Sequence, residues 1–124
     1  MVRVLIIDDH EPLLRALGKS LQGAGYEVDT ATSGSAALAM FRSAPYDVIV
    51  TDLIMPNGEG IETIMVLRKE FSSVGVVAMS GGSTHSPVYL RMARQLGAHV
   101  ALEKPFTVGE LVEAVENVRT LGVC

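Results

Sequence analysis

Cysteine is almost absent from this sequence, and long apolar runs are missing as well. The only cysteine is Cys124, which excludes an intrachain disulfide and a zinc site built on several cysteines. A chain without disulfides suits a reducing compartment, so we predict a cytoplasmic location. No stretch reaches the roughly 18 consecutive apolar residues of a membrane helix. The apolar residues 4–7 are too short for the core of a signal peptide, and we expect no contact with a membrane.

Excess positive charge is also missing. Lys and Arg number 10 against 14 Asp and Glu, which gives a formal net charge of −4. Binding of nucleic acid through a broad surface needs clustered cations that neutralise phosphates, so we expect no direct nucleic-acid binding. The patterns G-x-x-x-x-G-K-[ST] and G-x-G-x-x-G do not occur, which argues against a nucleotide or flavin site.

Short apolar runs alternate with helical patterns along the whole chain. Continuous apolar runs are typical of buried parallel strands, whereas the alternating residues 26–31 indicate a strand at the edge of a sheet. Thr107 and Glu110 have the spacing of a capping box at the start of the last helix. The expected strands are residues 4–7, 26–31, 48–52, 74–79 and 99–102, and the expected helices are residues 11–23, 33–43, 61–71, 86–97 and 107–120.

This alternation predicts the fold class. Strands that are separated by helices run parallel with right-handed crossovers, which places helices on both faces of one sheet. A length of 124 residues is enough for one self-sufficient core. We therefore predict a single domain over residues 1–124, with an α/β doubly wound fold of five parallel strands and five helices.

Reactive side chains stand where the expected strands end. These are Asp8 and Asp9 after the first strand, Asp52 at the third, Ser80 at the fourth and Lys104 at the fifth. In doubly wound folds the carboxyl ends of the strands meet at one edge, where ligands bind. We therefore expect these side chains to converge.

Their chemistry favours a metal-assisted phosphoryl site. Clustered carboxylates repel one another unless a cation shares them, and Mg²⁺ suits a site with few carboxylates that also accepts a phosphate oxygen. An aspartate beside such a cation can attack a phosphoryl group and form an aspartyl phosphate. Lys104 and the Ser80 hydroxyl are suited to contact the phosphoryl oxygens. The backbone N–H groups of Gly81 and Gly82 can approach too, because no Cβ blocks them.

Taken together, these motifs resemble the receiver domain of two-component response regulators, the family that includes the chemotaxis response regulator. The resemblance covers nearly the whole chain, through residues 5–9, 52–56, 80–81 and 104–106. It implies a flavodoxin-like sheet with strand order 2-1-3-4-5. It also implies that Asp52 accepts a phosphoryl group from a phosphohistidine, on a sensor histidine kinase or a phosphotransfer protein of a phosphorelay.

The resemblance assigns the remaining roles. Asp9, Asp52 and the backbone carbonyl of Ile54 would bind Mg²⁺, and Asp8 would act largely through water. Lys104 would pair with the phosphoryl group, helped by a cis peptide before Pro105. Ser80 and Gly81 would bind the phosphoryl group and switch. A downstream effector or a second copy of the chain would bind a face formed by the fourth helix, the fifth strand and the fifth helix.

One position departs from the family pattern. An aromatic residue usually stands three positions before the lysine and turns inward when the hydroxyl moves toward the phosphoryl group. Here that position holds Ala101, which has no side-chain rotamer to switch. The signal then has to take another route, such as the loop of residues 81–86 and the fourth helix.

Other interpretations stay open at this stage. Taken singly, each site residue has a structural explanation, and only their joint occurrence at strand ends favours a site. The three histidines are interpreted as surface or loop residues.

The receiver resemblance predicts no enzymatic activity beyond self-phosphorylation and self-dephosphorylation. The alternative is a Mg²⁺-dependent phosphohydrolase with an aspartyl-phosphate intermediate, although such enzymes usually place a second acid two residues after the nucleophile. Both a stand-alone receiver and part of a longer regulator fit the sequence.

A first prediction concerns Ile54, two residues after Asp52. Its apolar side chain is expected near the path of a water molecule that attacks the aspartyl phosphate, where it would hinder hydrolysis. Ile54→Asn should therefore shorten the phosphorylated lifetime, measured as the first-order decay of labelled protein. Unchanged or slower decay would contradict this role.

Overall fold

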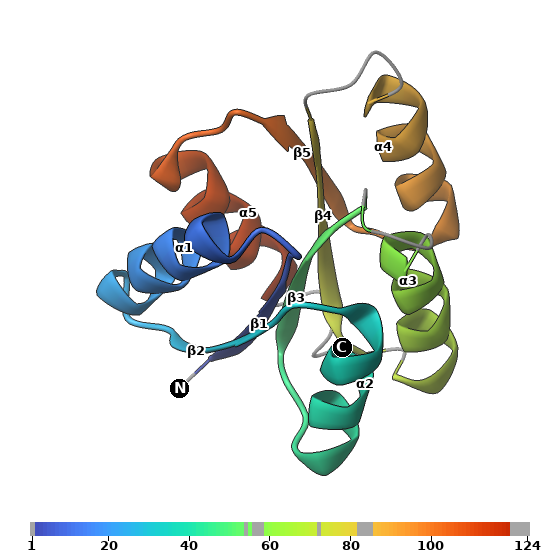
Figure 1. Ribbon diagram of the computed structural model, residues 1–124, viewed down its shortest axis with the longest axis horizontal. Coiled ribbons are helices and arrows are strands. Elements are labelled where there is room, and N and C mark those ends of the chain that lie inside the picture. The colour runs from blue at the N-terminus through green and yellow to red at the C-terminus, as the bar shows by residue number, and fades with distance from the viewer. Residues whose placement is uncertain (1, 54, 56–58, 72, 82–85, 120–124) are drawn as a thin grey trace.

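The structure is a computed structural model that describes residues 2–53, 55, 59–71, 73–81 and 86–119. It forms one sheet with strand order β2-β1-β3-β4-β5, in which every neighbouring pair is parallel (Figure 1). The strands are β1 (Arg3–Ile7), β2 (Glu27–Ala31), β3 (Val48–Asp52), β4 (Gly75–Gly81) and β5 (Val100–Lys104). The helices are α1 (Glu11–Gly23), α2 (Gly34–Ser43), α3 (Glu59–Glu70), α4 (Ser86–Leu96) and α5 (Val108–Arg119). The predicted α/β fold and strand order are confirmed.

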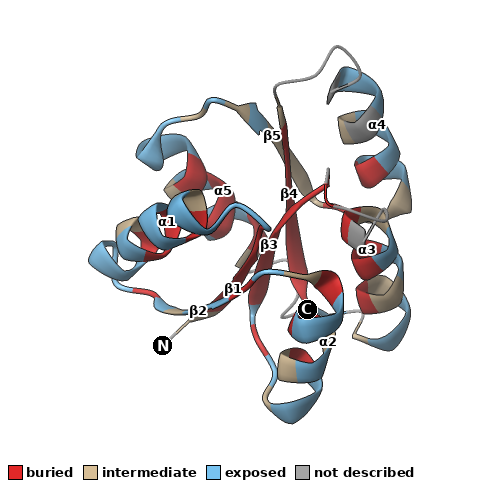
Figure 2. Cartoon of the chain, in the orientation of Figure 1, coloured by how far each residue is buried: buried red, intermediate tan, exposed pale blue. Residues whose placement is uncertain are grey.

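Helices cover both faces of the sheet, α1 and α5 on one side and α2, α3 and α4 on the other (Figure 1). Side chains alternate along each strand, so Ile6 packs in the cluster under α1 and α5 while Leu5 and Ile7 pack under α2 and α3. The central strands are buried along most of their length (Figure 2). This double burial explains their continuous apolar sequences.

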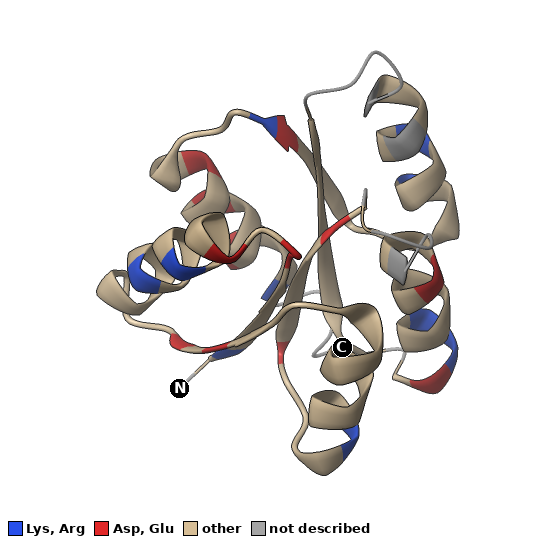
Figure 3. Cartoon of the chain, in the orientation of Figure 1, with Lys and Arg blue, Asp and Glu red and all other residues tan. Residues whose placement is uncertain are grey.

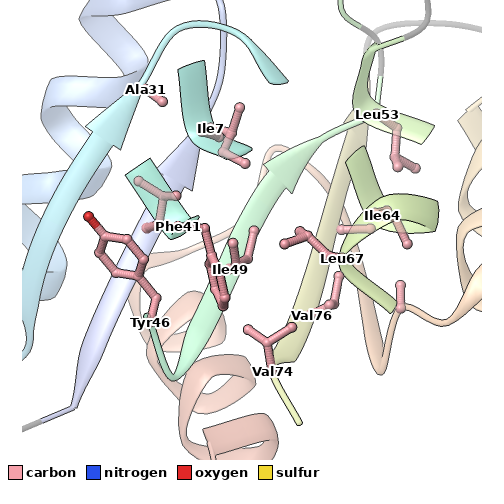
Figure 4. Packing of buried hydrophobic residues seen from close by; sticks show 14 of the residues in the cluster. Ile7, Ala31, Phe41, Tyr46, Ile49, Leu53, Ile64, Leu67, Val74 and Val76 are labelled. Atoms are coloured by element: carbon pink, nitrogen blue, oxygen red, sulfur yellow. The ribbon is translucent and has the colours of Figure 1, made fainter. Parts of the chain in front are cut away.

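Three of the six aromatic residues, Phe41, Tyr46 and Phe71, gather in the cluster under α2 and α3. The Phe41 ring lies 4.3 Å from the Phe71 ring and 5.8 Å from the Tyr46 ring, measured between centroids. Tyr46, two residues before β3, belongs to the same buried cluster as Ile49 (Figure 4). Its hydroxyl donates a hydrogen bond of 2.6 Å to Asp29 on β2, and burial, reinforced by that carboxylate, raises the pKa of Tyr46 to about 12.

β2 is an edge strand, as its alternating sequence predicted. Three of its five residues are exposed and only Ala31 is buried. α1 packs closely on it, because a Cβ at Gly18 would stand 3.6 Å from the Thr30 side chain. Tyr26, just before the strand, donates a hydrogen bond to Glu116 and so ties the segment between α1 and β2 to α5.

Local chemistry sets the ends of several elements. The Thr107 hydroxyl accepts the Glu110 N–H at 3.0 Å, and the Glu110 carboxylate accepts the Thr107 N–H at 3.1 Å, which confirms the predicted capping box. β4 and β5 are longer than predicted, since Gly81 pairs with Lys104 at their carboxyl ends. Ser80 and Lys104 therefore belong to strands and not to the loops after them.

Among the described residues, no helix has the length and apolar character needed to span a bilayer.

A second prediction follows from the start of α3, where Gly60 lies against the end of β3. A Cβ at Gly60 would stand 2.3 Å from the Asp52 carbonyl oxygen and 2.7 Å from Leu53 Cα. Gly60→Ala should therefore lower the free energy of unfolding by roughly 1–3 kcal/mol, although alanine is the better helix former. Urea denaturation measures this change.

Gly109→Ala is the matched control for that substitution. Gly109 also lies in a helix, and its added Cβ would meet only the Thr107 hydroxyl at 3.8 Å, an ordinary contact. This variant should gain up to about 1 kcal/mol from helix propensity. Equal effects of the two substitutions would show that the contact with β3 does not constrain residue 60.

Candidate functional site

Three carboxylates meet at the carboxyl edge of the sheet. Asp8 and Asp9 follow β1 and Asp52 ends β3, and each offers a carboxylate oxygen within 4.8 Å of the others. The acidic segments after β1 and at the end of β3 lie close together (Figure 3). Asp8 and Asp52 are buried whereas Asp9 is exposed, so the cluster opens to solvent on the side of Asp9.

The sheet fixes the two buried carboxylates. Ile7 pairs with Thr51, so the next residues, Asp8 and Asp52, stand at equivalent positions on neighbouring strands. The Thr51 hydroxyl donates to the Asp52 carbonyl at 3.1 Å, and the Leu53 N–H donates to the Met79 carbonyl at 2.9 Å. The backbone around Asp52 is therefore held by the residue before it and by β4.

Asp8 also organises the turn into α1. Its N–H donates to the Ala31 carbonyl at 3.1 Å, and its Oδ1 accepts the His10 N–H at 2.9 Å. His10 precedes the first residue of α1 and makes no side-chain cap of its own, so the Asp8 carboxylate serves one of the backbone donors at this helix start. Only Oδ1 is used in this way, and Oδ2 faces Lys104.

Lys104 is the cation of the site. Its Nζ stands 3.1 Å from Asp8 Oδ2 and 3.7 Å from Asp52 Oδ2. The two carboxylate side chains are 1% and 8% exposed and the lysine side chain 25%, so their attraction is only partly screened by water. Three carboxylates and one ammonium leave a formal charge of −2, which matches one divalent cation.

Glycine at position 81 allows β4 and β5 to approach closely beside this lysine. A Cβ there would stand 2.5 Å from the Lys104 Cβ. The Lys104–Pro105 peptide bond is cis. A groove of about 470 Å³ opens next to the lysine, between α1 and the start of the chain segment that leads to α5; it is lined by Leu13, Leu17, Gly81, Lys104, Pro105 and Phe106.

The other predicted site residues lie as follows. Ser80 is fully buried in β4, one residue after Met79, the partner of Asp52 across the sheet. Ala101 is half-buried in β5 and pairs with Ala78, so both neighbours offer only a methyl group. The Ile54 carbonyl and Gly82 lie outside the described residues.

The sequence had not suggested two features of the site. One is the direct contact of Lys104 with Asp8. The resemblance had assigned Lys104 to the phosphoryl group and Asp8 to Mg²⁺ binding through water. The other is the groove beside Lys104, which Leu13 and Leu17 of α1 line in part. Charge balance could have predicted the contact between Lys104 and Asp8, because three clustered carboxylates are stabilised by a nearby cation.

Comparisons with known proteins agree on the family. The family model described as the response regulator receiver domain matches residues 4–116. The KDP operon transcriptional regulatory protein KdpE of Escherichia coli is 37% identical over 111 residues, which are 90% of this chain and 48% of that protein. The transcriptional regulatory protein PrrA of Mycobacterium leprae is 36% identical over 115 residues, 92% of this chain and 48% of that protein.

Solved structures give the same result. A receiver domain from Clostridium thermocellum superimposes with a TM-score of 0.90 at 28% identity, covering 97% of this chain and 95% of that one. The chemotaxis protein CheY4 of Vibrio cholerae gives 0.85 at 32% identity, covering 95% and 98%. The chain spans about half the length of the curated relatives it matches. It belongs to the family of response regulator receiver domains of two-component systems.

Proposed function

We propose that this receiver domain accepts a phosphoryl group on Asp52 from the phosphohistidine of a sensor kinase or phosphotransfer protein. The observation that carries the proposal is the buried carboxylate of Asp52, held beside two further acids and a lysine at the carboxyl edge of the sheet. In the transfer, an Asp52 oxygen attacks phosphorus while the bond from phosphorus to the imidazole nitrogen breaks. The product is an aspartyl phosphate.

Lys104 would serve the same reaction by changing its partner. In the structure its ammonium lies against Asp8 Oδ2, with Asp52 Oδ2 only 0.6 Å farther away (3.7 against 3.1 Å). A phosphoryl group on Asp52 adds negative charge on the side of Asp52, so the flexible lysine stem would turn toward it. The Ser80 hydroxyl and the backbone of Gly81, on the neighbouring strand, would contact the phosphoryl oxygens.

Magnesium is the cofactor that this proposal includes. Asp8, Asp9 and Asp52 would hold the ion, since three oxygen donors from carboxylates and a formal charge of −2 suit a hard divalent cation. The ion would neutralise the negative charge that otherwise repels an incoming phosphoryl group. The Ile54 carbonyl belongs to the proposed ligand set by resemblance alone.

We further propose that the domain catalyses only its own phosphorylation and dephosphorylation, in the cytoplasm, and passes the signal on by binding. The proposed output face consists of α4, β5 and α5. Its helices carry exposed apolar side chains, with Val88 50%, Met92 39% and Val108 52% exposed. Such side chains suit an interface with an effector or with a second copy.

A third prediction tests the phosphoacceptor. With Mg²⁺ and a small phosphodonor such as acetyl phosphate, the protein should gain one base-labile phosphate per chain, and Asp52→Asn should reduce labelling to background because an amide is no nucleophile here. Intact-protein mass spectrometry measures the added phosphate. Asp47→Asn is the matched control, since Asp47 precedes the amino end of β3 and its carboxylate accepts only the Arg3 backbone N–H among the hydrogen bonds described.

The same assay decides between the receiver and a phosphohydrolase. A receiver should retain its phosphate and release few phosphates per chain. Continuous release of many phosphates from varied monoesters would favour the phosphohydrolase. Labelling of Asp52→Asn at the rate of the unmodified protein would remove Asp52 from its proposed role.

A fourth prediction concerns the metal. At a Mg²⁺ concentration about 100 times its Kd, the free energy of unfolding should rise by about 2.7 kcal/mol, because the ion binds the folded site. Asp9→Asn should remove most of this rise, whereas Glu113→Gln should keep it, since Glu113 is an exposed acid on α5 outside the cluster. Urea denaturation with Mg²⁺ and with EDTA measures the difference; an equal rise in both variants would rule out the cluster as the site.

A further inference from the structure

His99 lies at the amino end of β4, at the opposite edge of the sheet from Asp52. The His99 N–H donates to the Val76 carbonyl at 2.8 Å, and the Val76 N–H donates to the His99 ring nitrogen Nδ1 at 3.0 Å. If the parallel ladder were longer, a backbone carbonyl of the neighbouring strand would accept the Val76 N–H. Here the imidazole takes the place of a peptide group and ends the ladder between β4 and β5.

The chain before His99 turns tightly over the side chain of Arg68. Gly97 has a positive φ of 120°, and a Cβ there would stand 2.5 Å from Arg68 Cγ. The Arg68 guanidinium donates from Nη1 to the Val74 carbonyl at 2.8 Å, just before β4. The end of α3, the start of β4 and the turn from α4 to β5 therefore meet around Arg68 and His99.

The hydrogen bond from Val76 requires an unprotonated Nδ1, so the neutral ring carries its proton on Nε2. Burial lowers the pKa of His99, and the positive charge of Arg68 lowers this pKa further. Arg68 is the charged group that shifts this pKa. Other charged groups on neighbouring elements are Arg91 and Arg94, exposed on α4, and Lys69 and Glu70, exposed at the end of α3, where Glu70 pairs with Arg42. Arg119 at the end of α5 pairs with Glu116, and Asp47 before β3 accepts the Arg3 N–H. β4 itself contains no charged residue.

We propose that His99 is a pH-sensitive latch that holds the turn between α4 and β5 to the start of β4 while its ring is neutral. Protonation turns Nδ1 from an acceptor into a donor that faces the Val76 N–H, and it places an imidazolium near the Arg68 guanidinium. Both changes favour release of the turn. The latch lies at the amino end of the strands, away from the carboxyl edge that holds Asp52.

The sign of the pH dependence follows from these contacts. The neutral ring is favoured in the folded protein, so the pKa of His99 is lower in the folded than in the unfolded chain. As the pH falls through the usual value of 6.5, the unfolded chain binds a proton first, and the free energy of unfolding decreases. The loss is complete once the pH lies below the folded-state pKa.

The fifth prediction compares the unmodified protein with His99→Asn, without phosphodonor, by urea denaturation between pH 7.5 and 5.5. Asparagine keeps an acceptor oxygen two bonds from Cβ, as Nδ1 is, but does not titrate. Over this range the folding equilibrium constant of the unmodified protein should fall roughly fivefold relative to the variant, as expected for loss of one partly buried hydrogen bond. The comparison cancels the titration of the other two histidines.

NMR of the unmodified protein gives an independent readout. The ring should titrate with a pKa below 6.5, with Nδ1 unprotonated above it, and exchange of the Val76 amide should accelerate in acid after correction for the intrinsic rate. A His99 pKa at or above 6.5, or the same pH dependence in the unmodified protein and His99→Asn, would overturn the latch. If His99→Asn does not fold, the NMR titration of the unmodified protein alone tests the latch. Neither experiment involves phosphoryl transfer, so a result against the latch leaves the proposed function unaffected.

Discussion

The ammonium of Lys104 between Asp8 and Asp52 is the interaction on which this site depends. Two ionised carboxylates that are almost fully buried repel strongly in a medium of low dielectric. One lysine at 3.1 and 3.7 Å offsets part of that repulsion and still leaves an excess of negative charge. The site is therefore stable enough to fold, while it retains the charge that attracts a divalent cation. In the proposed reaction the same ammonium exchanges one carboxylate for a phosphoryl group.

The sheet makes this arrangement possible, because it holds the participating backbone in place before any ligand binds. Asp52 ends β3, which is hydrogen-bonded to β1 and β4. Lys104 ends β5, where it pairs with Gly81 of β4. Groups on paired strands are positioned more precisely than groups on loops, and such preorganisation lowers the cost of reaching a reactive geometry. Movement is left to side chains, chiefly the flexible stem of Lys104.

The sequence predicted the elements whose cause is local or strongly periodic. α1 begins at Glu11 and ends at Gly23 as predicted, because an acid and a proline mark its start and leucines follow at helical spacing. The capping box of α5 and the limits of β3 were also correct. In each case the decisive residues lie within a few positions of one another.

The remaining features depend on contacts between distant parts of the chain. Glu103 and Lys104 are polar and suggested a loop, but they pair with Ser80 and Gly81 and extend β5. The contact of Lys104 with Asp8 joins residues 96 positions apart, so spacing carries no signal for it. The interpretation of His99 as a loop residue is correct, since it precedes β5, but nothing in the sequence reveals that its ring accepts a backbone hydrogen bond.

The alternation of side chains along the strands has a consequence for how this chain can change over time. The apolar residues under α1 and α5 and those under α2, α3 and α4 form two groups without a common member. A substitution that leaves a void on one side can be compensated by neighbours on that side alone. The residues on each side of the sheet can therefore be substituted independently of the other side, while Asp8, Asp9 and Asp52 keep their positions at the carboxyl edge.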